Sequence, residues 1–249
     1  MVLPRIIANW KMNGSSKLIH SWISTTGKKI PYKYQNICLF CPPVCYLSQA
    51  SSLLEEQELN FILGAQNIDA DTDNALTGGI SASMLEDLKC KYIIVGHSER
   101  RIFLQEEEET LHKKLKTAVS KKLGIIYCVG ETSLEKDQGK ASTVILNQLN
   151  LLKKIESDSL VIAYEPVWAI GSGKHASPEY IKEMHSVIKE ELNSIERRNV
   201  DIPVAYGGSI DVSNVKSIIN VSNVDGLLIG GASLDAEEFS KIARISLDY

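Results

Sequence analysis

Short runs of apolar, β-branched residues recur along this chain at a nearly constant spacing, and this feature limits its fold more than any other. Eight such runs occur, and their centres lie about 32 residues apart, close to the ~30 residues of a strand–helix–strand unit. Continuous apolar runs are typical of parallel strands covered on both faces. The runs span Arg5–Asn9, Asn36–Phe40, Phe61–Gly64, Tyr92–Val95, Ile125–Val129, Leu160–Tyr164, Ile202–Tyr206 and Gly226–Ile229.

Segments rich in Lys, Glu and Leu lie between these runs. Eight repeats with no linker and no break in composition predict an α/β fold, a single closed (βα)8 TIM barrel of eight parallel strands over residues 1–249. Periodicity alone leaves an open, doubly wound sheet possible, and the length alone would also allow two small lobes. Helices are expected at Ser15–Thr25, Thr110–Leu123, Ser142–Ile155, Pro178–Ile195 and Asp235–Ile245.

The charge balance limits the classes of partner. The chain has 31 acidic and 27 basic residues and a net charge of −4, so we expect neither a nucleic-acid partner nor attraction to an anionic membrane surface. An anionic ligand would have to be held by a local site. No apolar run approaches the ~20 residues of a membrane-spanning helix. The first 13 residues do not resemble a signal peptide, which favours a cytoplasmic location.

The cysteines support the same compartment, because an odd number, five, is unusual for a disulfide-bonded secreted protein. Cys38 and Cys41 form a CxxC motif. In a buried strand these positions point to opposite faces, roughly 10 Å apart, which is too far for a disulfide. We therefore favour buried packing over a metal or redox role.

Polar and glycine-rich segments follow five of the eight runs. In a barrel of this kind the functional residues lie at the carboxyl ends of the strands and in the loops that follow. The sequence therefore predicts a site built from Asn9–Gly14, Gly96–Arg101, Glu165–Lys174, Gly207–Ser209 and Gly230–Ser233.

Three residues in these segments could carry chemistry. Lys11 would supply positive charge for an anion, or would be an ordinary surface lysine. His97 precedes a short helix whose N-terminus would disfavour the imidazolium and keep the ring neutral. Glu165 ends an apolar run, where a carboxylate is costly unless it is solvated, paired or used as a base.

Two glycine-containing pairs, Gly208-Ser209 and Gly230-Gly231, would let backbone N–H groups approach an anion such as phosphate, although ordinary tight turns are an alternative. The segment Ala169–Gly173 could form a lid that excludes water. The string 171–176 also fits the dinucleotide fingerprint G-x-G-x-x-A, but it neither follows a strand directly nor opens a helix, so a Rossmann interpretation is disfavoured.

Five motifs, in order along the whole chain, resemble those of the triosephosphate isomerase family. The resemblance implies a homodimeric enzyme that interconverts dihydroxyacetone phosphate and D-glyceraldehyde 3-phosphate in glycolysis and gluconeogenesis. It also implies that no metal and no organic cofactor is needed. The motifs are Asn9-Trp-Lys-Met-Asn-Gly, Gly96-His-Ser-Glu-Arg-Arg, Ala163-Tyr-Glu-Pro-Val-Trp-Ala-Ile-Gly, Tyr206-Gly-Gly-Ser and Gly230-Gly-Ala-Ser-Leu.

The resemblance also implies roles for individual residues. Glu165 would remove a proton from carbon next to the carbonyl, and neutral His97 would polarise that carbonyl. Lys11 would place its charge beside the enediolate and the phosphate, and Asn9 would donate a hydrogen bond to the same oxyanion.

Glu99 resembles a residue with a supporting proton-relay role, although an ion pair with Arg100 or Arg101 is an equal alternative. The phosphate would be held by backbone amides of Gly171, Ser209, Gly230 and Gly231.

The sequence departs from the family pattern in two places. The family usually has threonine at Ser172 and at His175, and the histidine leads us to expect that lid closure depends on pH near 6–7. The family usually has an acid at Gly79, in the loop Gln66–Gly79 that would reach into a neighbouring subunit. A homodimer with one ion pair missing is therefore expected.

Two other functions are compatible with a barrel of this kind. Another phosphate-binding barrel enzyme, such as a sugar-phosphate epimerase, would share the glycine pairs but not the other motifs. A non-catalytic binding or adhesion protein on the same barrel would be favoured by the loss of Lys11, His97 or Glu165, and all three are present.

Overall fold

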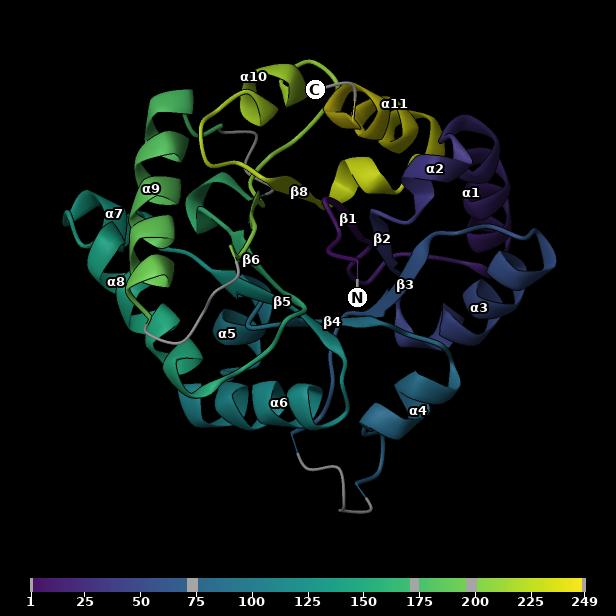
Figure 1. Cartoon of the computed structure of the whole chain (residues 1–249), viewed down its shortest axis with the longest axis horizontal. Coiled ribbons are helices and arrows are strands. Elements are labelled where there is room, and N and C mark those ends of the chain that lie inside the picture. The colour runs from purple at the N-terminus through teal and green to yellow at the C-terminus, as the bar shows by residue number, and fades with distance from the viewer. Residues whose placement is uncertain (1, 71–75, 171–174, 196–200, 248–249) are drawn as a thin grey trace.

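The computed structural model describes residues 2–70, 76–170, 175–195 and 201–247, and these form a barrel of parallel strands inside a ring of helices (Figure 1). Each strand pairs with the next along the chain, and the last pairs with the first, which confirms the predicted TIM barrel. The strands are β1 (Ile6–Asn9), β2 (Cys38–Cys41), β3 (Ile62–Ala65), β4 (Tyr92–Val95), β5 (Gly124–Val129), β6 (Leu160–Tyr164), β7 (Val204–Tyr206) and β8 (Gly226–Ile229).

Two strands, β2 and β7, begin two residues later than the apolar runs predicted. Before β2, the N–H of Ile37 donates to the carbonyl of Tyr34 and thus closes a turn. Before β7 lies Pro203, which has no N–H to donate to the ladder, so the strand begins at Val204.

The helices in the described part of the chain cover the outside of the barrel (Figure 1). The helix expected at Ser142–Ile155 is shorter than predicted, because the chain tightens after Leu149 into a 3-10 segment over Asn150–Lys154. The α-helices are α1 (Ser16–Lys29), α2 (Tyr32–Gln35), α3 (Leu47–Glu56), α4 (Ala82–Asp87), α5 (Ser98–Phe103), α6 (Glu108–Ser120), α7 (Ser133–Asp137), α8 (Ala141–Leu149), α9 (Pro178–Ser194), α10 (Val215–Ile219) and α11 (Ala236–Leu247).

The core has two layers, as strand alternation requires. One layer, which includes Phe40 and Trp22, lies between the strands and the helices. The other fills the barrel interior and includes Ile7 and Tyr92. Cys38 belongs to the outer layer and Cys41 to the inner one, so the two thiols point to opposite faces as predicted, and neither is in a disulfide.

Within the described ranges, no helix is long and apolar enough to cross a membrane. The same residues contain no group of three His, Cys, Asp or Glu side chains that could hold a metal ion.

Candidate active site

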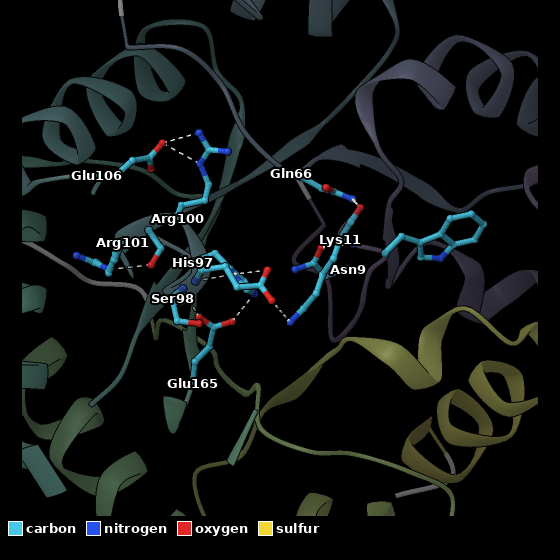
Figure 2. A network of polar contacts seen from close by, with 12 residues as sticks. Asn9, Lys11, Gln66, His97, Ser98, Arg100, Arg101, Glu106 and Glu165 are labelled. Carbon is cyan, nitrogen blue, oxygen red and sulfur yellow. Dashed lines mark hydrogen bonds and ion pairs between the residues drawn. The ribbon is translucent and has the colours of Figure 1, made fainter. Parts of the chain in front are cut away.

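The loops after β1, β4, β6, β7 and β8 converge on one cavity of about 260 Å³ at the carboxyl ends of the strands. The predicted residues Asn9, Lys11, His97, Glu165, Ser209, Gly230 and Gly231 all line it. Figure 2 shows the polar side chains at its centre. The convergence follows from the fold, because in a closed parallel barrel all strands end on the same rim.

Glu165 is buried at the end of β6 and faces the imidazole of His97. Its carboxylate accepts from His97 Nε2 at 3.0 Å and from the N–H of Ser98 at 3.0 Å. Burial alone would raise the pKa of Glu165, but His97, the Ser98 N–H and Lys11 outweigh it, so this pKa lies below its usual value. The carboxylate is therefore ionised and held in place by donors.

The imidazole of His97 is buried, and the residue caps the N-terminus of α5. Its Nδ1 accepts from the N–H of Glu99 at 3.2 Å. Burial opposes the charged form, yet the neighbouring carboxylate of Glu165 raises the pKa of His97 above its usual value. The backbone N–H of Glu99 instead favours the neutral imidazole, because a protonated Nδ1 could not accept a hydrogen bond from it. This geometry favours a neutral ring with its proton on Nε2.

Lys11 adopts a left-handed backbone conformation, with φ of 51°, immediately after β1. Its N–H donates to Asn9 Oδ1, and its carbonyl accepts from Gln66 Nε2 at 2.9 Å. The Gln66 amide also donates to the carbonyl of Cys41. Lys11 Nζ lies 2.6 Å from Glu99 Oε1. Gln66 was not predicted as a site residue, since nothing in the strand-end pattern after β3 singles it out.

The alternative considered for Glu99, an ion pair with Arg100 or Arg101, is wrong. Its carboxylate pairs with Lys11 rather than with Arg100 or Arg101. Arg100 instead forms an ion pair with Glu106, and Arg101 turns back to backbone carbonyl groups. The reason is that barrel closure brings the ends of β1 and β4 together on one rim, a proximity that sequence neighbours do not reveal (Figure 2).

The two glycines after β8 leave space that no atom of the described residues fills. Among those residues, a Cβ at Gly231 would meet nothing within 4 Å, and one at Gly230 would meet only Lys11 Cε, at 3.5 Å. Neither glycine has a φ in the left-handed region, but Gly230, with φ of −87° and ψ of −111°, lies outside the backbone regions that other residues favour. The carbonyl of Gly230 is fixed by Ser233, whose Oγ donates to it at 2.6 Å. Room for a ligand explains the two glycines better than packing does.

The predicted lid lies largely outside the described residues, and the proposed phosphate contact Gly171 is among those not described. The part that follows is described. Ser177 caps α9 by accepting from the N–H of Tyr180, with Pro178 at the first helical position, as the sequence predicted.

One buried carboxylate near the lid was missed. Glu131 is fully buried and accepts from Tyr164, from Trp168 Nε1 at 2.8 Å and from Tyr180. Burial raises the pKa of Glu131 above its usual value, although the hydrogen bonds from these donors act to lower it. Lys136 Nζ lies over the Trp168 ring, 3.5 Å from its centroid, so this indole contacts a cation at its face and a carboxylate at its Nε1. No sequence motif pairs these residues.

His175 contacts the loop that follows β7. Its Nδ1 lies 3.2 Å from Asn214 Nδ2, which also donates to the carbonyl of Ser209. The Asn214 amide has a fixed orientation, because its Oδ1 accepts from the N–H of Asp211. The imidazole nitrogen therefore accepts, which requires it to be unprotonated.

Comparison with known proteins agrees with this geometry. A family model described as triosephosphate isomerase matches residues 4–246. The triosephosphate isomerase of Buchnera aphidicola subsp. Cinara cedri is 39% identical over 253 residues, which cover 99% of each chain. Those of Escherichia coli and Shigella boydii are 35% identical over 246 residues, 97% of this chain and 96% of theirs.

Proposed function

This chain belongs to the triosephosphate isomerase family, and from that premise we propose how its residues interconvert dihydroxyacetone phosphate and D-glyceraldehyde 3-phosphate. The observation that carries the proposal is the pairing of Glu165 with His97 in a cavity that also contains a lysine and two unfilled glycine positions. This enzyme is the standard example of a carboxylate base matched with a neutral imidazole.

Glu165 acts as the base. A substrate that enters the cavity replaces the contact between the carboxylate and His97, and the carboxylate takes the proton from C1 of dihydroxyacetone phosphate. The electron pair of that C–H bond forms the C1–C2 double bond of the enediolate. Glu165 then returns a proton to C2, and the aldehyde forms at C1. Its lowered pKa supports this role, because the base is ionised before substrate arrives.

His97 and Asn9 stabilise the oxygen on which charge develops. The Nε2–H of the neutral ring donates to the carbonyl oxygen and carries protons between O1 and O2 of the enediolate. The side-chain amide of Asn9 lines the same cavity and donates to the same oxygens. Donors already in place lower the barrier because they need no reorganisation during the reaction.

Lys11 and the glycine loops hold the anionic parts of the substrate. The Lys11 ammonium attracts the phosphate and the enediolate, while backbone amides of Ser209, Gly230 and Gly231 bind phosphate oxygens. Gly171 contributes a further amide when the lid closes and keeps water from the enediolate. The Glu99 carboxylate, bound to Lys11 and 3.6 Å from His97 Nδ1, supports proton movement at the imidazole.

The active form is a homodimer in the cytoplasm. A second hollow, lined by Lys11, His97 and Phe103 among others, opens beside the cavity. Apolar side chains are exposed around it, with Met12 97% and Phe103 76% accessible. An apolar surface of this kind marks a protein contact, and the loop 66–79 of a second copy is its occupant. The five free cysteines support a reducing compartment.

An isomerisation assay coupled to glycerol-3-phosphate dehydrogenase tests the activity. The parent should turn over triose phosphate, and Glu165→Gln should lose about 10²- to 10⁴-fold in kcat. Glu56→Gln, an exposed glutamate on α3, is the matched control and should retain full activity. An inactive parent, or an active Glu165→Gln variant, would contradict the proposal. Sedimentation equilibrium and cell fractionation test the dimer and its location.

A further inference from the structure

A guanidinium group lies behind the candidate site, and the mechanism above does not use it. Arg101 belongs to α5, one helical turn after His97. It lines a separate hollow of about 190 Å³ together with Gly96, Ser98 and Glu165, whereas it does not line the substrate cavity. Glu165 lines both spaces, so Arg101 approaches the catalytic pair from the side away from the substrate.

The contacts of Arg101 all go to the ends of β4 and β5. Its Nε donates to the carbonyl of Gly96 at 2.8 Å, and its Nη2 donates to the carbonyl of Cys128 and to Tyr127 Oη, both at 3.2 Å. Its own backbone N–H donates to the carbonyl of His97 at 3.2 Å. Arg101 therefore donates hydrogen bonds to the carbonyl groups of both Gly96 and His97, and its guanidinium also connects Gly96 to β5.

The backbone conformation at Gly96 leaves space for the Arg101 guanidinium. Gly96 has a φ of 76°, in the left-handed region that favours glycine. A Cβ at this position would lie 2.8 Å from Arg101 Nη2 and 3.2 Å from the carbonyl oxygen of Cys128. Both the turn before His97 and the space for the arginine thus require glycine.

β5, the strand to which the Arg101 guanidinium is hydrogen-bonded, also forms a backbone hydrogen bond with Glu165. The N–H of Glu165 donates to the carbonyl of Val129 at 2.8 Å, next to the Cys128 carbonyl that Arg101 binds. The guanidinium therefore joins the backbone that precedes the imidazole to β5, the strand to which the backbone N–H of Glu165 is hydrogen-bonded. A planar fork of donors suits this better than the single ammonium of lysine.

We infer that Arg101 is a positioning residue for the isomerisation, which sets the placement of the His97 ring relative to Glu165 through the Gly96–His97 peptide. This inference rests on the role proposed above for His97. A displacement of about 1 Å in a catalytic group can lower a rate about 10²-fold, so the loss of this bridge should affect turnover more than substrate binding.

A double-mutant cycle with Arg101→Gln and His97→Gln tests the inference. Arg101→Gln should lower kcat about 10- to 100-fold, with KM within about threefold. The kcat of the double variant should lie within about threefold of that of His97→Gln alone, because Arg101 acts through the imidazole. Arg101→Lys should recover only part of the activity. The matched control is Arg5→Gln, whose guanidinium also donates to a backbone carbonyl, that of Asp225, and which should keep parental kinetics.

The outcomes separate the two proposals. Full activity in His97→Gln would contradict the role of His97. A defective His97→Gln with an additive Arg101→Gln effect, or a folded Arg101→Gln enzyme with parental kcat, would overturn the role of Arg101. If Arg101→Gln does not fold, the cycle is run with Arg101→Lys. The ¹⁵N chemical shifts of the His97 ring should then differ from the parent, and unchanged shifts with unchanged kcat would refute the inference.

Discussion

Replacing Lys11 by methionine removes the one side-chain cation that lines the cavity among the described residues. Methionine keeps the length of the side chain without the charge. The Lys11 side chain is only 25% exposed, and its Cε lies 3.5 Å from a Cβ built at Gly230. An anion bound to the glycine amides would therefore lie within a few ångströms of the ammonium.

The magnitude follows from this distance. Two unit charges about 4 Å apart interact by about 4 kcal/mol at an effective dielectric constant of ~20. The Glu99 carboxylate, 2.6 Å from Lys11 Nζ, offsets part of this attraction. A net loss of about 2–4 kcal/mol is therefore expected, which lowers kcat/KM about 30- to 1,000-fold.

Steady-state kinetics at low and high ionic strength measure this loss. Lys11→Met should also weaken competitive inhibition by inorganic phosphate, because the free anion meets the same charge. Lys17→Met, which removes an exposed lysine from α1, is the matched control and should behave like the parent. A loss of less than about threefold in kcat/KM, or unchanged phosphate inhibition, would refute the electrostatic argument.

Three further predictions concern stability, assembly and the lid. Burial lowers the pKa of His185 to about 4, so the unfolded chain binds a proton at this residue that the folded chain does not as pH falls from about 6.5 to 4. His185 should therefore contribute a loss of about 3 kcal/mol to the unfolding free energy of the parent over that range. His185→Gln should lose less in urea titrations, and an equal loss would contradict the assignment. Met12→Asp should convert the proposed homodimer to a monomer in sedimentation equilibrium; an unchanged dimer mass would contradict an interface at this surface. His175→Thr removes the contact between the imidazole Nδ1 and Asn214; the pH-sensitive lid expected from the sequence predicts that the profiles of turnover against pH differ between parent and variant, and identical profiles would contradict it.

The barrel could be predicted from the sequence because its strands are set by local pattern. Runs such as Tyr92–Val95 and Gly226–Ile229 are apolar throughout, and the structure places strands at these same residues. Pro203 could also have marked the later start of β7. These features depend on neighbours in sequence.

The partners within the site could not be predicted in the same way. Lys11 and Glu99 are 88 residues apart and meet only because the barrel closes. Gln66, Glu131 and Arg101 act through contacts with backbone or with distant aromatic groups, and no spacing rule reveals such contacts. The sequence predicts which residue types lie at the strand ends, whereas only the folded structure shows which of them pair.

In the proposed mechanism one carboxylate, that of Glu165, carries the proton between two carbon atoms of the substrate. The most direct test is turnover of dihydroxyacetone phosphate in deuterium oxide, with the product analysed by ¹H NMR. A proton held on Glu165 can exchange with solvent, so D-glyceraldehyde 3-phosphate should carry deuterium at C2, and Glu165→Gln should form almost no labelled product. Product with only protium at C2, formed at similar rates by the parent and by Glu165→Gln, would indicate transfer that does not use this carboxylate and would contradict the proposed mechanism.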